Sequence, residues 1–406
     1  MNQTLKHYIG SWKARPAAFI QSILIFFVVL IQPFKELHSF YDGLLAISLI
    51  FTIVMIIKGK FHQLPRAFIY IFGAYTLSIL ISTFMSIDVE KSLDEGLRSE
   101  YLKQVIVFAL LLVNAETVER RIKTVIAAFF LSGLIMSTIG FFPYFWGSLR
   151  TYDNRLLSFS GSYTRLAYFY TLYIPFLVLL VPRNIKWKSA LYALLFLSIV
   201  ATLFTKTRGA WVSIPPALLT VCLISRKYKR LAFIFAMTVM SVGVILVASP
   251  DLRNRIADFE ELKKGSGSFG QRFGLWKSAV QTISENPVYG IGYGKYMFRK
   301  AYSLNPVKGS EAHSDTHNTY LEIMLQRGVI GFLTTAALYL FFLSRAWKAN
   351  QTGNSSRRDF FAYFMAISAA FALFSLVDNI YVKETGRYLW QIGALAFLFS
   401  SDSDEE

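Results

Sequence analysis

The sequence predicts an all-α integral membrane protein with about twelve transmembrane helices and one large outer loop between the ninth and the tenth. The first observation behind this is composition: 54% of the 406 residues are hydrophobic and 17% are charged, against about 25% charged in soluble domains. The second is that the apolar residues form runs close to the roughly 20 residues that a bilayer-spanning helix needs. The third is that the net charge of +17 collects between these runs. The pattern excludes a soluble enzyme.

Each predicted span is an apolar run bounded by charged or turn-forming residues. The first is retained in the protein, because a second run follows it closely and no small-residue cleavage site is evident. The fourth and the twelfth are short for a membrane span. In chain order the spans are predicted at residues 17–33, 41–57, 67–86, 102–115, 124–146, 163–182, 187–205, 210–225, 231–248, 326–344, 359–378 and 386–400.

The positive charges predict how the spans are oriented. Cytoplasmic loops of membrane proteins carry an excess of Lys and Arg. With a cytoplasmic N-terminus, the inner segments hold 20 of these residues and the short outer segments hold 10. Every inner loop has at least three. The distribution predicts that both termini are cytoplasmic and that the number of spans is even.

The spans divide the chain into four regions. Residues 1–248 hold the first nine spans, 249–317 form an outer loop or small cap, 318–400 hold the last three spans, and 401–406 form an acidic cytoplasmic tail. A smaller outer segment at 85–103 is predicted as an interfacial helix.

Two patterns stand out in the large loop. Bulky residues recur at helical spacing at Phe273, Trp276, Val280 and Ile283, ahead of a proline. The sequence Gly-Ile-Gly-Tyr-Gly at 290–294 follows. It is no dinucleotide fingerprint, because no strand precedes it and no obvious helix opens after it. It predicts a tight turn with an exposed backbone.

Composition also excludes several kinds of chemistry. The single cysteine, Cys222, lies in an apolar run, so the chain can form no internal disulfide, thiolate metal site or CxxC redox centre. Nucleic acid is not an expected partner, since the positive charge follows the short loops between spans. Walker loops, aspartate-rich metal clusters and nucleotide-binding motifs are absent from the sequence, and we expect no cofactor.

His317 is the leading candidate for catalysis. It lies in His-Ser-Asp-Thr-His-Asn at 313–318, where the large loop meets the tenth span. A neutral imidazole accepts a proton near neutral pH, which suits a general base acting on a hydroxyl. A loop histidine without a role is the alternative. His313 lies four residues earlier, but the pair has no third ligand in register and no HExxH glutamate, so we expect no metal.

Two arginines are the candidates for binding phosphate. Arg208 lies in a linker so short that it must sit at the membrane boundary, on the same outer side as His317. Arg272 opens the helical stretch of the large loop. Guanidinium groups match phosphate oxygens in geometry, although snorkelling or solvated arginines are the ordinary case. The weaker candidates, which helix-end ion pairs would also explain, are Arg165, Asp378, Glu384 and Arg387.

The orientation was derived from charge alone, yet it places His317, Arg208 and Arg272 on one face of the membrane. A base beside two phosphate-binding groups at headgroup depth is what transfer from a lipid-linked phosphate donor requires. The arginines would neutralise the departing diphosphate, and the histidine would activate the accepting hydroxyl.

At this point the chain resembles a known family. His317-Asn318, nine further residues and then Gly328-Val329-Ile330-Gly331 are similar to the H-N-x9-G-x-x-G signature of bacterial O-antigen ligases. The stretch from Arg208 to Trp211 resembles the R-G-x-W element of the same superfamily. The segment from Arg272 through Trp276 to Gly292 resembles its outer-loop helix and turn. The likeness covers about residues 200 to 335 together with the overall topology.

The resemblance implies a metal-independent, inverting glycosyltransferase of the bacterial inner membrane, with its active site and large loop facing the periplasm. The donor would be a glycan on undecaprenyl diphosphate, and the acceptor a sugar hydroxyl of lipid A–core, with both held among membrane lipids. His317 would be the catalytic base. The residues expected to bind the diphosphate or the substrates are Arg208, Arg272, Arg165, His313 and Asn318.

Two alternatives stay open at this stage. An O-antigen polymerase would share the fold and the chemistry but use a second lipid-linked glycan as acceptor, and Phe332 departs from the small or β-branched residue that often follows the ligase signature. A transporter of a lipid-linked or anionic sugar would show two related halves with charged residues or broken helices at mid-membrane. The sequence shows neither of these transporter features.

Overall fold

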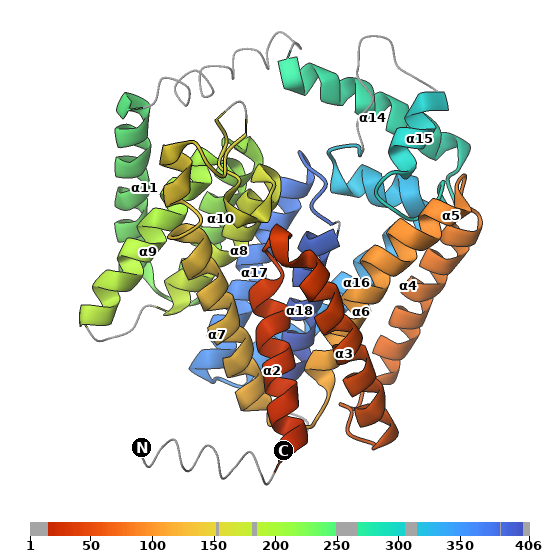
Figure 1. Ribbon diagram of the computed structural model, residues 1–406, viewed down its shortest axis with the longest axis horizontal. Helices are drawn as coiled ribbons and strands as arrows, with labels where there is room; N and C mark the ends of the chain where they lie inside the picture. Colours follow the sequence, from red (N-terminus) through yellow and green to blue (C-terminus); the bar gives the residue numbers. More distant parts are fainter. Residues whose placement is uncertain are drawn as a thin grey trace.

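The computed structural model describes residues 15–151, 154–180, 185–248, 267–304, 315–381 and 383–400. Over these ranges the regular structure is helical, apart from two isolated β-bridges. Most helices form one bundle, and a short helical cap covers one end of it (Figure 1). The helices are α2 (Pro16–Ile31), α3 (His38–Ile57), α4 (Arg66–Phe84), α5 (Val89–Lys91), α6 (Lys103–Leu112), α7 (Val118–Ser137), α8 (Tyr163–Leu180), α9 (Ile185–Phe204), α10 (Arg208–Ile224), α11 (Tyr228–Ala248), α14 (Gly267–Glu285), α15 (Met297–Leu304), α16 (Thr319–Gln351), α17 (Ser355–Ser375) and α18 (Lys383–Ser400).

The all-α prediction is confirmed over the described residues, and each of the twelve apolar runs lies on a helix. Among the described residues, seven helices are long and apolar enough to cross a membrane, and α2 and α10 are apolar but shorter. The number twelve therefore stays a prediction. The seven are Lys35–Ile57, Arg66–Phe84, Val118–Trp146, Tyr163–Leu180, Trp187–Phe204, Thr319–Gln351 and Ser355–Ser375.

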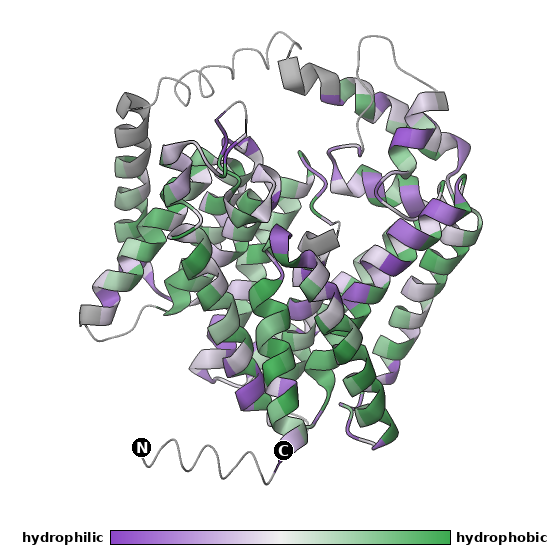
Figure 2. Cartoon of the chain, in the orientation of Figure 1, coloured by the Kyte–Doolittle hydropathy of each residue, from purple (hydrophilic) through white to green (hydrophobic). Residues whose placement is uncertain are grey.

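Hydropathy separates the body of the bundle from its cap. Hydrophobic residues fill the body, whereas hydrophilic ones gather in α14, α15 and the neighbouring segment near α5 (Figure 2). Within the body, α10 packs along α17, α16 along α4, and α18 along α6. Many large apolar side chains stay exposed on the outer helices, for example Ile57 and Tyr70. A bilayer would cover such surfaces.

The outer segment predicted at 85–103 is helical. It contains α5 and then a π-helix, η2 (Ser92–Leu102), that runs directly into α6. Ser92 donates a hydrogen bond to the carbonyl of Tyr293 at 2.6 Å, and Lys300 of α15 pairs with Asp88 at 2.8 Å. These contacts fasten the cap to the bundle.

Helix α16 is broken at Gly328, where φ is +61° and ψ is −165°. The glycine-rich turn of the large loop fills the break. The backbone N–H groups of Ile291 and Gly292 donate to the carbonyls of Leu325 (2.9 Å) and Gln326 (3.1 Å). On the far side of the break, Val329 N–H donates to Pro287 O at 2.8 Å. Backbone groups that the break frees are thus satisfied by the turn, as buried backbone requires.

Both partners in this contact need glycine. A Cβ on Gly328 would lie 2.2 Å from the carbonyl oxygen of Val288, and one on Gly290 would lie 2.4 Å from the carbonyl of Gln326. Both glycines also have positive φ. The turn expected at 290–294 is present, but residues 291–294 are buried rather than exposed, because the turn packs into the kink of α16 and holds it.

Candidate functional site

The loop that carries His317 is folded onto the first turns of α16. The backbone N–H of His317 donates to Asp315 Oδ1 at 3.1 Å, and that of Thr316 donates to Glu322 Oε2 at 2.9 Å. His317 itself has φ of +50°, which is uncommon for a residue other than glycine. Such strained residues persist where the surroundings over-determine them, and they concentrate at functional sites.

Asn318 and Thr319 tie the start of α16 to the loop that follows α17. The Asn318 side chain caps α16 by accepting from Leu321 N–H at 3.1 Å, and its amide donates to Leu376 O at 3.1 Å. The Thr319 hydroxyl donates to the carbonyl of Asp378 at 3.0 Å. The structure thus gives Asn318 a structural role, and its contact with substrate stays a prediction.

These ties bring the imidazole of His317 to two carboxylates. Its Nδ1 lies 3.3 Å from Asp378 Oδ1 and 3.5 Å from Asp315 Oδ1. In the tautomer in which Nδ1 carries the proton, Nδ1–H donates a hydrogen bond to Asp378 and the basic lone pair is on Nε2. The side chain is 28% exposed, so a substrate can reach it. A base whose tautomer and orientation are set by a carboxylate is a recurring catalytic arrangement.

The surroundings also set the pKa of His317. Burial lowers this pKa, but the hydrogen bond to Asp378 and the charges of Asp315 and Asp378 outweigh burial, and the pKa is raised above its ordinary value. The positive charge of Arg272 acts in the opposite direction. Arg272 is therefore close enough to His317 for the two charges to interact.

Helix α14 accounts for the position of Arg272. One turn after Arg272, the indole N–H of Trp276 donates to the carbonyl of Thr316 at 3.0 Å, which joins α14 to the histidine loop. The helical stretch predicted from the bulky residues of the large loop is confirmed as α14. The sequence predicts only that Arg272 and His317 lie on the same side of the membrane. The structure brings them into one cluster.

Arg208 is the first residue of α10, which packs along α17. A Cβ on the next residue, Gly209, would lie 2.6 Å from the ring of Phe374 and 3.1 Å from Val377. These residues directly precede Asp378, the partner of His317. Arg208 therefore lies at the end of α17 that carries the site, which we call the site end of the bundle.

The other predicted residues are placed less directly. Arg165 lies in the first turn of α8, and one turn later Tyr168 packs on Phe374, with ring centroids 6.1 Å apart. The helix thus reaches the site end, but binding by Arg165 stays a prediction. Arg387 is buried over the ring of Tyr41 at 4.8 Å. His313 lies outside the described residues, as does the side chain of Glu384.

Comparison with known proteins matches the stretch of the chain that carries this cluster. Residues 193–336 match the sequence profile of the family described as O-antigen ligase, and this range contains Arg208, Arg272 and His317. An O-antigen ligase of Salmonella typhimurium is 22% identical over 329 residues, which is 74% of this chain and 78% of the relative. These matches support membership of the O-antigen ligase superfamily.

Two further proteins are similar to this chain. An uncharacterised protein of Haemophilus influenzae is 23% identical over 332 residues, 78% of this chain and 81% of the relative. The ComP-specific O-oligosaccharyltransferase of Acinetobacter baylyi is 25% identical over 181 residues, 43% of this chain and 31% of the relative. The assignment and the apolar helices together indicate a multi-pass membrane protein and a glycosyltransferase of the ligase type.

Asp315 is not among the residues predicted from the sequence, and Asp378 is one of the weaker candidates. Both carboxylates lie within 4.8 Å of each other and of His317, and the three groups offer ligand types that a divalent metal ion accepts. Asp315 could have been found from its place two residues before His317. Asp378 is 61 residues away in sequence and reaches His317 only through the packing of α16 against the end of α17.

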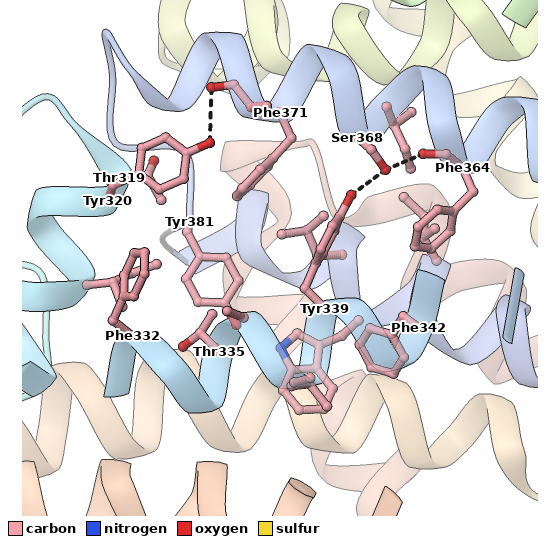
Figure 3. A pocket seen from close by; sticks show the side chains of 18 residues that line it. Thr319, Tyr320, Phe332, Thr335, Tyr339, Phe342, Phe364, Ser368, Phe371 and Tyr381 are labelled. Atoms are coloured by element: carbon pink, nitrogen blue, oxygen red, sulfur yellow. Dashed lines mark hydrogen bonds between the residues drawn. The ribbon is translucent and has the colours of Figure 1, made fainter. Parts of the chain in front are cut away.

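An apolar cavity of about 210 Å³ opens beside the site, between α16, α17 and α18. Thr319 and Tyr320, which follow His317 and Asn318 in sequence, line one end of it, and Phe342 and Phe364 line the other. Its walls are mainly aromatic rings (Figure 3). The Tyr320 hydroxyl donates to Ala372 O at 3.1 Å and that of Tyr339 bonds to Ser368, so these polar groups are satisfied within the wall.

The carboxylate beside His317 predicts a measurable pH effect. A base acts when it is neutral, so kcat/KM should fall as the pH drops through the pKa of His317, with a midpoint above about 6.5 because the pKa is raised. Asp378→Asn removes one of the two carboxylates that raise the pKa of His317 and should move this midpoint to lower pH. Arg272→Gln, measured in the same way, should move it to higher pH. An unchanged midpoint in Asp378→Asn would contradict this assignment.

Proposed function

We propose that the protein is an O-antigen ligase, which transfers a polysaccharide from undecaprenyl diphosphate to a sugar hydroxyl of lipid A–core. The observation that carries the proposal is the cluster itself. A histidine paired with a carboxylate, Arg272 within electrostatic reach and Arg208 at the same end of α17 all fall within the matched range 193–336. Residues 376–380, the start of α10 and the start of α16 meet there.

In the proposed reaction, Nε2 of His317 takes the proton of the accepting sugar hydroxyl. The hydroxyl oxygen attacks the anomeric carbon of the donor glycan, and the bond between that carbon and the diphosphate oxygen breaks. Attack opposite the leaving group inverts the configuration of the anomeric carbon. Arg208 and Arg272 compensate the charge that develops on the departing diphosphate. The products are the glycosylated lipid A–core and undecaprenyl diphosphate.

The aromatic-walled cavity supports a lipid-linked donor. A diphosphate held at His317 would place the first isoprene units of its carrier at Thr319 and Tyr320, where the cavity begins. The cavity is apolar and continues along α16 to Phe342, toward the middle of the bundle. Burial of hydrocarbon there would contribute binding energy remote from the reacting bond.

The acceptor decides between this proposal and its nearest alternative. The purified protein should be given a polymeric glycan on undecaprenyl diphosphate together with lipid A–core, and the products separated by gel and mass spectrometry. Transfer to lipid A–core is the expected result, and it should persist in EDTA. Joining of lipid-linked repeat units to one another would make the protein a polymerase. No transfer to either acceptor would reject glycosyl transfer and reopen the transporter alternative.

The arginine at the start of α10 provides a second prediction. Arg208→Lys keeps the positive charge but removes the planar fork that can bind two phosphate oxygens. We expect kcat/KM for the lipid-linked donor to fall by about tenfold or more, the equivalent of one charge-assisted hydrogen bond. Lys58→Arg, an exposed exchange at the end of α3, should leave the rate unchanged. Full activity of Arg208→Lys would reduce Arg208 to a general electrostatic role.

A further inference from the structure

A second and larger cavity lies at the other end of the bundle. Its volume is about 500 Å³, and it is bounded by α7, α8, α17 and α18. Its polar lining is concentrated in the first turns of α7 and α17, whereas His317 lies beyond the last turn of α17. The catalytic cluster and the polar mouth of this cavity therefore lie at opposite ends of α17, and no step of the proposed reaction uses the cavity.

The body of the cavity is shaped for a hydrocarbon chain. From Glu119 to Phe129 it follows α7 for about 15 Å, at 1.5 Å per residue, which is half of the roughly 30 Å hydrocarbon core of a bilayer. The lining along this depth is mostly apolar, including Phe176 and Leu395, and it also contains Tyr363 and Tyr388. The amide of Gln391, which lies there too, donates to Gln32 at 2.7 Å.

The mouth of the cavity carries both signs of charge. Lys123 and Arg357 are basic, and Glu119 and Asp359 are acidic. These charges are already paired in part: Lys123 pairs with Glu119 at 2.5 Å, and Asp359 accepts a hydrogen bond from Lys227 at 2.7 Å. Helices α7 and α17 both begin here, and helix N-termini favour a negatively charged group. The lining charges of the mouth balance, so a headgroup that carries one anion and one cation can join these ion pairs without adding net charge.

We infer that this cavity binds a zwitterionic phospholipid whose headgroup ends in a primary ammonium, with one acyl chain between α18 and the group α7, α8 and α17. The phosphate faces Lys123, Arg357 and the two helix N-termini. The ammonium faces the carboxylates of Glu119 and Asp359 and donates hydrogen bonds to them, which a quaternary ammonium cannot do. Helix α18 makes few direct contacts with α7, α8 or α17, so the chain completes their packing.

The site offers a specificity test that does not depend on glycosyl transfer. The full-length protein, delipidated in detergent, should be titrated with phosphatidylethanolamine, phosphatidylcholine and phosphatidylglycerol while Tm is measured, and bound lipid should be counted by native mass spectrometry. We expect one retained phosphatidylethanolamine and the largest rise in Tm with that lipid. Equal rises with all three lipids, or no retained lipid, would overturn the proposal even if the transferase activity is confirmed.

Two variants test separately how the apolar body and the charged mouth of the cavity contribute to lipid binding. Ile126→Trp fills the body and should abolish retention of the lipid. Arg357→Ala removes a phosphate partner and should weaken lipid binding about tenfold. Lys58→Ala, an exposed lysine outside the cavity, is the matched control and should bind as the wild type does. Lipid retained by a folded Ile126→Trp would overturn the proposal.

A labelling experiment covers the case in which the filled variant does not fold. Wild-type protein is irradiated with a phosphatidylethanolamine whose acyl chain carries a diazirine, and the labelled peptides are identified by mass spectrometry. Labels are expected on the cavity lining, near Ile126 of α7 and near Leu395 of α18. Labels confined to the exposed outer faces of α3 and α4 would show bulk lipid contact only and would overturn the proposal.

Discussion

Replacing His317 with alanine is expected to lower glycan transfer by about 10²–10⁴-fold, the range that a positioned general base contributes. The imidazole is the proton acceptor of the proposed reaction, and its Nδ1 is already engaged by Asp378 at 3.3 Å. The variant should still fold, because the bonds that shape its loop come from the backbone N–H groups of Thr316 and His317 and from the side chain of Asn318. The rate of transfer to lipid A–core by purified protein is the measurement.

The control for this experiment is His38→Ala, which removes a histidine at the first residue of α3 and outside the site. It should retain wild-type transfer. Tm and elution volume in detergent should be compared for all three proteins, so that a loss of rate is separated from a loss of folding. Wild-type transfer by a folded His317→Ala protein would remove His317 as the base and leave the carboxylates as the remaining candidates.

Replacing Gly328 with alanine is expected to cause the largest loss of stability. The backbone there, with φ of +61° and ψ of −165°, is essentially restricted to glycine, and the added Cβ would lie 2.2 Å from Val288 O. Backbone strain and overpacking each cost about 1–3 kcal/mol, so together they predict a loss of about 2–6 kcal/mol in the free energy of unfolding.

The measurement for Gly328→Ala is Tm in detergent together with the rate of transfer. Gly43→Ala is the matched control, because Gly43 lies inside α3 with nothing within 4 Å of an added Cβ. Alanine there should stabilise the helix by about 0.5–1 kcal/mol. Equal Tm values for Gly328→Ala and the wild type would mean that the kink is not needed for folding.

Much of the bundle could be predicted from the sequence because a membrane imposes simple rules. Apolar run length located the helices, and bulky residues at helical spacing located α14 in the large loop. The charge of the short segments placed Arg208, Arg272 and His317 on one face, and the structure places Arg272 electrostatically near His317 and Arg208 at the same end of α17. Each of these signals is local in sequence or additive over a segment.

What the sequence did not reveal depends on contacts between distant segments. The apolar run of the tenth span begins at residue 326, whereas α16 begins at Thr319, because its first turns are covered by the polar cap rather than by lipid. The spacing of apolar residues does not reveal the break at Gly328, because the break depends on hydrogen bonds from the distant turn at 287–292. Asp378 acquires its role only when α17 brings it to His317.

The break in α16 also accounts for the nine residues between Asn318 and Gly328. Thr319–Arg327 form a separate helical segment of about two and a half turns, with Asn318 capping one end and the glycine turn holding the other. Removing one residue would turn the histidine loop by about 100° relative to the break and shorten the segment by about 1.5 Å. The nine-residue spacing thus fixes both the distance and the rotation between the histidine loop and the break. Between His317 and Gly328, the length of the chain therefore sets where the imidazole points.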